Sequence, residues 1–275
     1  MSTPVYTNST NKGALSPSEQ IVYLELCRNH VMPFSKIAKG FKNNNSARMA
    51  MSRLVRKGYA VRPRQGIYAA IPPALVGRKN YEVDRYILAD AIVRPGGALA
   101  YHTALELHGA AQSYFNTVFA FTSAPRRRFE DRDVEYVFIQ PKSLFGIQRV
   151  IRMNVEVRVT DRERTFLDCL RRLDYCGGPE EYIKSVQTFH MLDFKNLEGH
   201  LRKFGERSLY QKAGYVLTLL ADDFHPPGET MKALGKKVGK KAYYLLPRSA
   251  PGSGRLDGEW NVIVPKNVKE LMRFV

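Results

Sequence analysis

The sequence predicts an α+β fold in two parts, a small N-terminal unit at residues 14–78 and a larger mixed α/β unit at residues 83–275. Three observations lead to this prediction. Apolar residues recur at helical spacing through the first sixty residues. Two short apolar stretches then surround a turn that contains Pro63 and Gly66. Beyond residue 83, stretches with the pattern of strands precede stretches with the pattern of helices.

The first helix begins at Ser16, which can cap it, with Pro17 at the first helical position and Glu19 completing a capping box. Asn29 and His30 end this helix. Its apolar residues have helical spacing and are Ile21, Leu24 and Cys27, flanked by Val22, Tyr23 and Leu26.

A second, short helix is predicted in FSKIAKGF (34–41), with Ser35 as a possible cap. Its inward residues are expected to be Ile37, Ala38 and Phe41. A turn of three asparagines follows, and Asn45 or Ser46 is able to cap a third helix. Gly58 ends that third helix.

The third helix has two distinct faces when it is plotted at about 100° per residue. Its apolar side lies within about 80° of Ala47 and holds Ala50, Met51, Leu54 and Val55. Its opposite face is polar and includes three arginines. The residues on this face are Asn45, Arg48, Met49, Ser52, Arg53 and Arg56.

Two short strands, 59–62 and 67–71, come next, and Arg62 and Arg64 lie at the turn between them. Three helices followed by a basic hairpin is the order of a winged helix-turn-helix, in which the third helix enters the major groove and the hairpin contacts the DNA backbone or the minor groove. Arginine offers forked donors to guanine or phosphate, and asparagine suits adenine. The predicted DNA-binding residues are Asn45, Ser46, Arg48, Met49, Ser52, Arg53, Arg56, Arg62 and Arg64.

Charge favours the same region. The chain carries a formal charge of +17, and its first 78 residues hold twelve Lys and Arg but only the two acids Glu19 and Glu25. Such an excess favours a polyanionic partner, with double-stranded DNA first among the candidates. A winged helix used for protein contacts, with a solvated basic face, remains the alternative.

Residues 72–82 are a plausible linker, and the following unit has no internal repeat. Helices are expected at 83–94 and 98–108, and strands at 117–122, 134–140, 147–152 and 155–160. Further helices are expected at 162–173, 179–189, 194–204 and 209–222, then apolar runs at 243–246 and 260–264 around a Gly/Pro/Ser loop at 247–258.

No catalytic pattern emerges. Glu156 and Asp133 faintly resemble a nuclease carboxylate set, but the lysine of such a set is missing. Arg164 and Asp168 are four residues apart on one predicted helix, which Thr160 or Asp161 caps, so an ion pair is the simple interpretation. The six histidines and three cysteines have no ligand spacing. We therefore expect no enzyme activity, no cofactor and no metal.

No apolar run approaches the length of a membrane span, the N-terminus has no signal-peptide core, and the cysteines suit a reducing compartment. These features predict a cytoplasmic protein without a membrane partner. Two further basic clusters, Arg126–Arg128 and Lys236–Lys241, are read either as solvated surface or as contacts for a phosphate or a protein partner.

Four segments in this order resemble the AbiEi family of transcriptional regulators, which are antitoxins of bacterial and archaeal toxin–antitoxin pairs. The segments are GIYAAIP (66–72), ALAYHTALELHGA (98–110), VRVTDRERTFLDCLRR (157–172) and YCGGPEEYIKSV (175–186). The resemblance runs from about residue 18 to about residue 220. The chain departs from the family in its polar leader and its basic C-terminal tail.

The resemblance implies an autoregulator that represses its own promoter at inverted repeats and counteracts a nucleotidyltransferase toxin. In the family, the third helix and wing bind DNA, which corresponds here to Arg48, Arg53, Arg56, Arg62 and Arg64. A monomer that binds cooperatively and a free dimer are equally plausible. The alternative is a protein-interaction module that holds a toxin and binds DNA only non-specifically.

Overall fold

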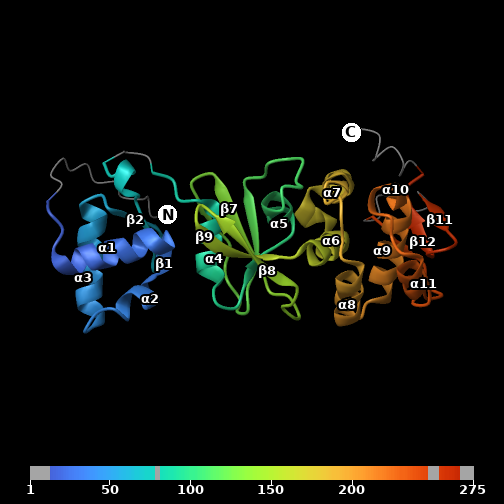
Figure 1. Ribbon diagram of the computed structural model, residues 1–275, viewed down its shortest axis with the longest axis horizontal. Helices are drawn as coiled ribbons and strands as arrows, with labels where there is room; N and C mark the ends of the chain where they lie inside the picture. Colours follow the sequence, from blue (N-terminus) through green and yellow to red (C-terminus); the bar gives the residue numbers. More distant parts are fainter. Residues whose placement is uncertain (1–12, 78–80, 247–253, 267–275) are drawn as a thin grey trace.

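The computed structural model describes residues 13–77, 81–246 and 254–266 of the chain. They form an elongated α+β molecule with three successive parts along its long axis: an N-terminal helical part, a central sheet, and a C-terminal helical part (Figure 1). The order of the parts in space follows their order in the sequence.

The N-terminal part combines three helices with a small antiparallel sheet. The helices are α1 (Pro17–Asn29), α2 (Phe34–Ala38) and α3 (Asn44–Arg56). The strands β1 (Val31–Pro33), β2 (Ala60–Arg64) and β3 (Ile67–Ala70) pair in the order β1-β3-β2. A short 3₁₀ turn, η1 (Pro73–Leu75), leads out of this part.

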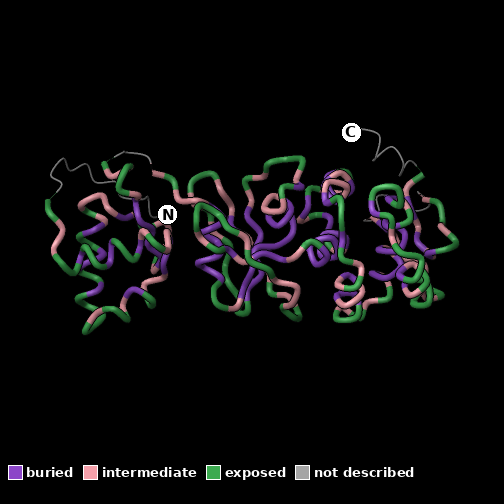
Figure 2. The backbone as a smooth tube through the Cα atoms, in the orientation of Figure 1, coloured by how far each residue is buried: buried purple, intermediate pink, exposed green. Residues whose placement is uncertain are grey.

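The predicted start of α1 is confirmed, since Ser16 and Glu19 form a reciprocal capping box. The helical spacing is confirmed, and the burial distinguishes the two rows: Ile21 and Leu24 are 68% and 59% exposed, while Val22, Tyr23 and Leu26 are buried. The helix therefore turns Val22, Tyr23 and Leu26 to the core, and its tube carries both buried and exposed stretches (Figure 2).

Two predicted caps are wrong. Asn43 caps α3, because its side-chain oxygen accepts from the Ser46 N–H at 2.9 Å, and Asn45 and Ser46 lie within the first turn. Pro33 precedes α2, so Ser35 lies inside that helix and caps nothing. Strand β1 was not predicted, and it pairs Val31 with the distant Ala69.

The central part is a six-stranded mixed sheet. Helix α4 (Arg85–Val93) leads to β4 (Ala98–Leu99) and α5 (His102–Leu107), followed by β5 (Thr117–Phe121), β6 (Phe129–Asp131), β7 (Val134–Ile139), β8 (Ile147–Arg152) and β9 (Val155–Thr160). The strand order is β6-β7-β5-β4-β9-β8. Neighbours pair antiparallel except β5 with β7 and β4 with β9, which are parallel.

The expected helix at 98–108 is wrong at its beginning, because Ala98 and Leu99 form β4 in the middle of the sheet. Strand β6 was not predicted. The strands expected at 117–122, 134–140, 147–152 and 155–160 are confirmed to within one residue at each end.

The C-terminal part is mainly helical. It contains α6 (Arg162–Arg171), η2 (Leu173–Cys176), α7 (Gly178–Gln187), α8 (Phe194–Phe204), α9 (Arg207–Leu219), α10 (Ala221–Phe224) and α11 (Gly228–Gly235). A last sheet joins β10 (Tyr243–Tyr244), β12 (Val262–Val264) and β11 (Arg255–Asp257) in that order. Of the loop expected at 247–258, residues 247–253 lie outside the described residues, and β11 occupies part of the remainder.

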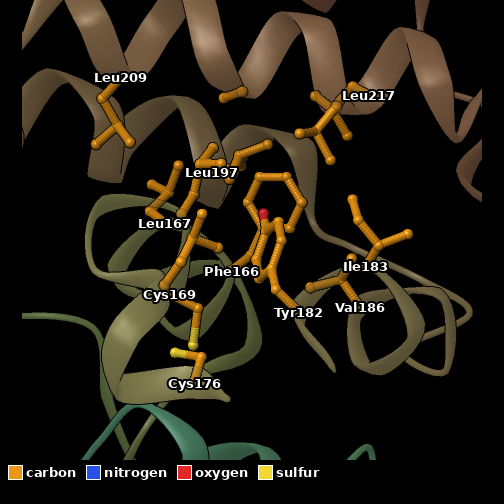
Figure 3. Close-up of a cluster of buried hydrophobic side chains, with 14 of the residues drawn as sticks. Phe166, Leu167, Cys169, Cys176, Tyr182, Ile183, Val186, Leu197, Leu209 and Leu217 are labelled. Carbon is orange, nitrogen blue, oxygen red and sulfur yellow. The ribbon is translucent and has the colours of Figure 1, made fainter. Parts of the chain in front are cut away.

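Buried side chains form three clusters. One lies among α1, α3 and the N-terminal sheet. A second joins Val31, Ile67 and Ala69 of that sheet to α4 and one face of the central sheet. The largest lies among the C-terminal helices, where Phe166 and Tyr182 pack together with Leu197 and Leu217 nearby (Figure 3). The N-terminal part is therefore packed onto the sheet through a shared core.

In the part of the chain that the structure describes, no helix has both the length and the apolar character that crossing a bilayer requires. The predicted boundary between the two units falls at residues 78–83, of which residues 78–80 lie outside the described ranges.

Candidate nucleic-acid interface

The outer face of α3 is open to solvent. All the residues predicted on it are exposed: Asn45, Ser46, Arg48, Met49, Ser52, Arg53 and Arg56. Within the described residues, the three arginines on this face form no ion pair with any carboxylate. Their guanidinium groups are therefore free to donate to an external acceptor.

Burial on the other side holds α3 in place. Ala47, Ala50, Met51 and Leu54 are buried against α1 and the sheet, as the helical plot predicted. Just after the helix, Lys57 donates to Glu19 of α1 at 2.8 Å. Burial alone would raise the pKa of Glu19, but the Lys57 ammonium and the Ser16 N–H outweigh burial and lower it. This pair ties α1 to the end of α3.

Aromatic rings lie below two of the predicted contact residues. The Arg48 guanidinium lies 5.8 Å from the ring centre of Phe34 in α2. The Arg62 guanidinium lies 5.7 Å from the ring centre of Tyr68 in β3. Both contacts restrain long side chains that remain exposed, so less conformational entropy is lost when they bind.

Arg64 is placed differently. Its guanidinium lies 4.2 Å from the ring centre of Phe129 in β6, and its Nη1 is buried without a hydrogen-bond partner. Burial lowers the pKa of Arg64, and the nearby charge of Arg126 lowers it further. The structure thus separates Arg64 from the exposed set and turns it toward the central sheet.

This packing brings a second basic segment to the hairpin. Arg126, Arg127 and Arg128 are exposed in the loop between β5 and β6, and Arg128 reaches Glu135 at 3.4 Å.

Lys39 and Lys42, exposed between α2 and α3, were not singled out from the sequence. Their position in the turn before the third helix was the available signal.

The cluster at Lys236–Lys241 lies elsewhere. It follows α11, which is at the opposite end of the long axis from α3 (Figure 1). Within one molecule, this cluster does not lie beside the N-terminal helices, so a shared phosphate contact with α3 is excluded for a single copy.

The other sequence candidates are structural. The expected ion pair is confirmed, since Arg164 Nε lies 2.6 Å from Asp168 Oδ2, and Asp161 caps α6 through the Arg164 N–H. Cys169 and Cys176 are buried free thiols that face one another in Figure 3. Cys176 is the last residue of η2. Among the described residues, no group of three or more His, Cys, Asp and Glu side chains is placed to hold a metal.

Comparison with known proteins adds a fold relative. No protein-family model matches the chain, and no curated protein matches it. The chain is similar in fold to the RV2827C protein from Mycobacterium tuberculosis. Its crystal structure matches with a TM-score of 0.61 over 94% of this chain and 95% of that chain, at 17% sequence identity. A likeness at this identity concerns the fold alone.

Proposed function

We propose that this chain is a sequence-specific DNA-binding repressor whose N-terminal part acts as a winged helix-turn-helix. The observation that carries the proposal is the outer face of α3, which presents Arg48, Arg53 and Arg56 without an acidic partner in the described structure. In this arrangement α3 is the recognition helix, and β2 and β3 form the wing.

The contacts divide by geometry. Arg53 and Asn45 lie on the exposed face that would enter the major groove and read base edges. Arg62, on the wing, is assigned to phosphates. Arg64 is assigned a different task from the one its sequence position predicts: its packing on Phe129 anchors the wing to the sheet. The exposed Arg126–Arg128 loop beside it extends the phosphate-binding surface.

The proposed biological role is autoregulation and antitoxin activity in the cytoplasm, paired with a nucleotidyltransferase toxin. Support for this part is the resemblance of four segments to the AbiEi family, with GIYAAIP (66–72) at the end of the wing and VRVTDRERTFLDCLRR (157–172) running through β9 and α6. The antitoxin role is tested by co-expressing the chain with a nucleotidyltransferase encoded next to its gene. Rescue of growth supports that role, and unrelieved toxicity contradicts it.

DNA recognition is tested with about 200 base pairs from upstream of the gene and a scrambled fragment of equal length, at about 50 and 200 mM salt. We expect a preference for the upstream fragment that survives the higher salt. Equal and salt-sensitive binding to both fragments would overturn sequence-specific repression.

A second candidate function is the holding of a protein partner, with DNA bound only non-specifically. The specific observation that favours it is the pair Ile21 and Leu24, which are 68% and 59% exposed one turn apart on α1. The double variant Ile21→Ser with Leu24→Ser separates the candidates. Loss of toxin neutralisation with intact DNA binding would favour the protein-holding function.

A further inference from the structure

A pocket of about 320 Å³ lies between the central sheet and the helices α6 and α9. Five of its lining side chains are basic, and Glu206 is the acidic residue among those that line it. The basic residues come from separate places: Lys142 follows β7, and Lys212 belongs to α9. Arg164 lies in the first turn of α6, and Arg171 and Arg172 lie at its end. The pocket is therefore an assembled site with an excess of positive charge.

Not all of these charges are neutralised within the protein. Arg171 makes a two-bond contact with Glu206, and Arg172 makes one with Asp174. Lys142 and Lys212 have no ion-pair or hydrogen-bond partner in the described part of the chain. Burial lowers the pKa of Lys212, although the Glu206 carboxylate acts in the opposite direction. An anion in the pocket would offset this cost.

A positive charge is also held in a fixed position in the wall of the pocket. The Arg164 side chain is only 2% exposed, and its Nε–H donates to Asp168 Oδ2. Its Nη1 is buried without a hydrogen-bond partner in the described residues. A ligand in the pocket does not reach this buried atom, so Arg164 contributes positive charge to the wall and no direct contact. The rings of Phe145 and Phe204 lie within 3.9 and 4.5 Å of this guanidinium and hold it in place.

Helix α9 adds a third element. It begins at Arg207, and the side chain of its cap residue Glu206 makes no capping hydrogen bond, because Arg171 engages that carboxylate instead. Ser208, in the first turn, lines the pocket. The first turn of a helix presents N–H groups and a partial positive charge, both of which favour a phosphate.

We propose that this pocket binds a small phosphorylated molecule, with Lys142 and Lys212 as its anion contacts. Its volume suits a ligand no larger than a mononucleotide. Tyr101 and Phe121, whose ring centres are 5.3 Å apart, form an aromatic wall on which the rest of the ligand would lie. Helices α6 and α9, which line the pocket, lie away from α3 along the long axis (Figure 1), so this site is independent of the proposed DNA surface.

The test is calorimetric titration of the full chain, freed of nucleic acid, with inorganic pyrophosphate and separately with ADP. We expect both to bind. Lys142→Gln and Lys212→Gln should each weaken binding about tenfold, because each removes a charged hydrogen-bond donor. Lys195→Gln, which changes an exposed residue of α8 outside the pocket, should leave affinity unchanged.

Two controls keep the result interpretable. Urea unfolding of each variant establishes that it is folded, and Arg53→Gln tests whether the anion binds to α3 instead. Tighter binding of ADP than of pyrophosphate would indicate that the nucleoside also contacts the aromatic wall. Equal binding would indicate that the phosphates supply the affinity. Absence of binding by both probes, affinity unchanged in the Lys142→Gln/Lys212→Gln double variant, or loss of binding in Arg53→Gln would each overturn the proposal.

Discussion

Two sets of three arginines, one on α3 and one on α6 with its C-cap, have opposite surroundings. On α3, Arg48, Arg53 and Arg56 are exposed and have no carboxylate partner among the described residues. At α6 and its C-cap, three arginines have one: Arg164 pairs with Asp168, Arg171 with Glu206 and Arg172 with Asp174. The exposed Arg162 at the start of α6 has no ion pair in the described part of the chain. The comparison shows that the acids nearby, and not the arginines themselves, decide whether a basic helix is available for an external ligand.

The largest effect is expected where pairing is most buried. Arg164→Met should destabilise the protein by about 3–5 kcal/mol, because it leaves the fully buried Asp168 without its partner. Arg172→Met, whose pair with Asp174 is exposed, should cost about 0–1 kcal/mol. Urea unfolding measures both, and equal losses would contradict the contrast.

The same variant has a pH signature. Burial raises the pKa of Asp168 to about 6, although Arg164 lies beside it, so the native protein loses stability as the pH rises toward 6. Without Arg164, the pKa of Asp168 rises further, and the loss continues to higher pH. The stability deficit of Arg164→Met should therefore be larger at about pH 8 than at about pH 5.

The next effect concerns the paired lysine beside α3. Lys57→Met should cost about 1–3 kcal/mol, because Glu19 is buried and loses its cation. The lowered pKa of Glu19 means that its stabilisation is present at neutral pH and is lost as the pH falls through that pKa. When the unfolding midpoint is measured at decreasing pH, it should fall less in Lys57→Met than in the unmodified protein. Lys42→Met, at an exposed position, is the matched control.

The unpaired arginines should affect binding and not stability. Arg53→Ala should weaken binding to the preferred DNA by about 1–3 kcal/mol and relax sequence preference, while its unfolding curve stays unchanged. Arg172→Ala is the control, since it removes an exposed arginine far from α3. Competition between specific and scrambled fragments gives the readout, and intact preference in Arg53→Ala would remove α3 from the role of recognition helix.

The smallest effect is expected at the loop between β5 and β6. Arg127→Ala should weaken binding to all sequences about equally and reduce the salt slope by about one, as expected for loss of a single phosphate contact. Binding at several salt concentrations measures that slope. An unchanged slope would show that the loop is only solvated surface.

Local signals in the sequence were sufficient for several elements. The capping box at Ser16 and Glu19 fixed the start of α1, and α8 was predicted at its observed limits of Phe194 and Phe204. The inner face of α3 was also predicted correctly, because Ala47, Met51 and Leu54 repeat at helical spacing in a segment that is polar elsewhere. In each case, neighbours in sequence determine the structure.

Non-local contacts account for what was missed. Ala98 and Leu99 have helical propensity, yet pairing with β5 and β9 makes them a strand. Arg64 was grouped with Arg62 because both lie at one turn, but the strand that packs against it, β6, begins only at Phe129. The pocket has the same origin, since Lys142 and Lys212 meet only after the sheet and α9 are packed together.

The shared core between the N-terminal sheet and α4 also bears on how such a protein can evolve. Val31, Ile67 and Ala69 lie in one apolar cluster with Leu88 and Ile92 of α4, so division of the chain near residue 80 exposes apolar surface on both pieces. A recombination event that moved the first three helices to another protein would leave this surface uncovered. The shortest segment of the chain that keeps this apolar surface covered runs from α1 to β9.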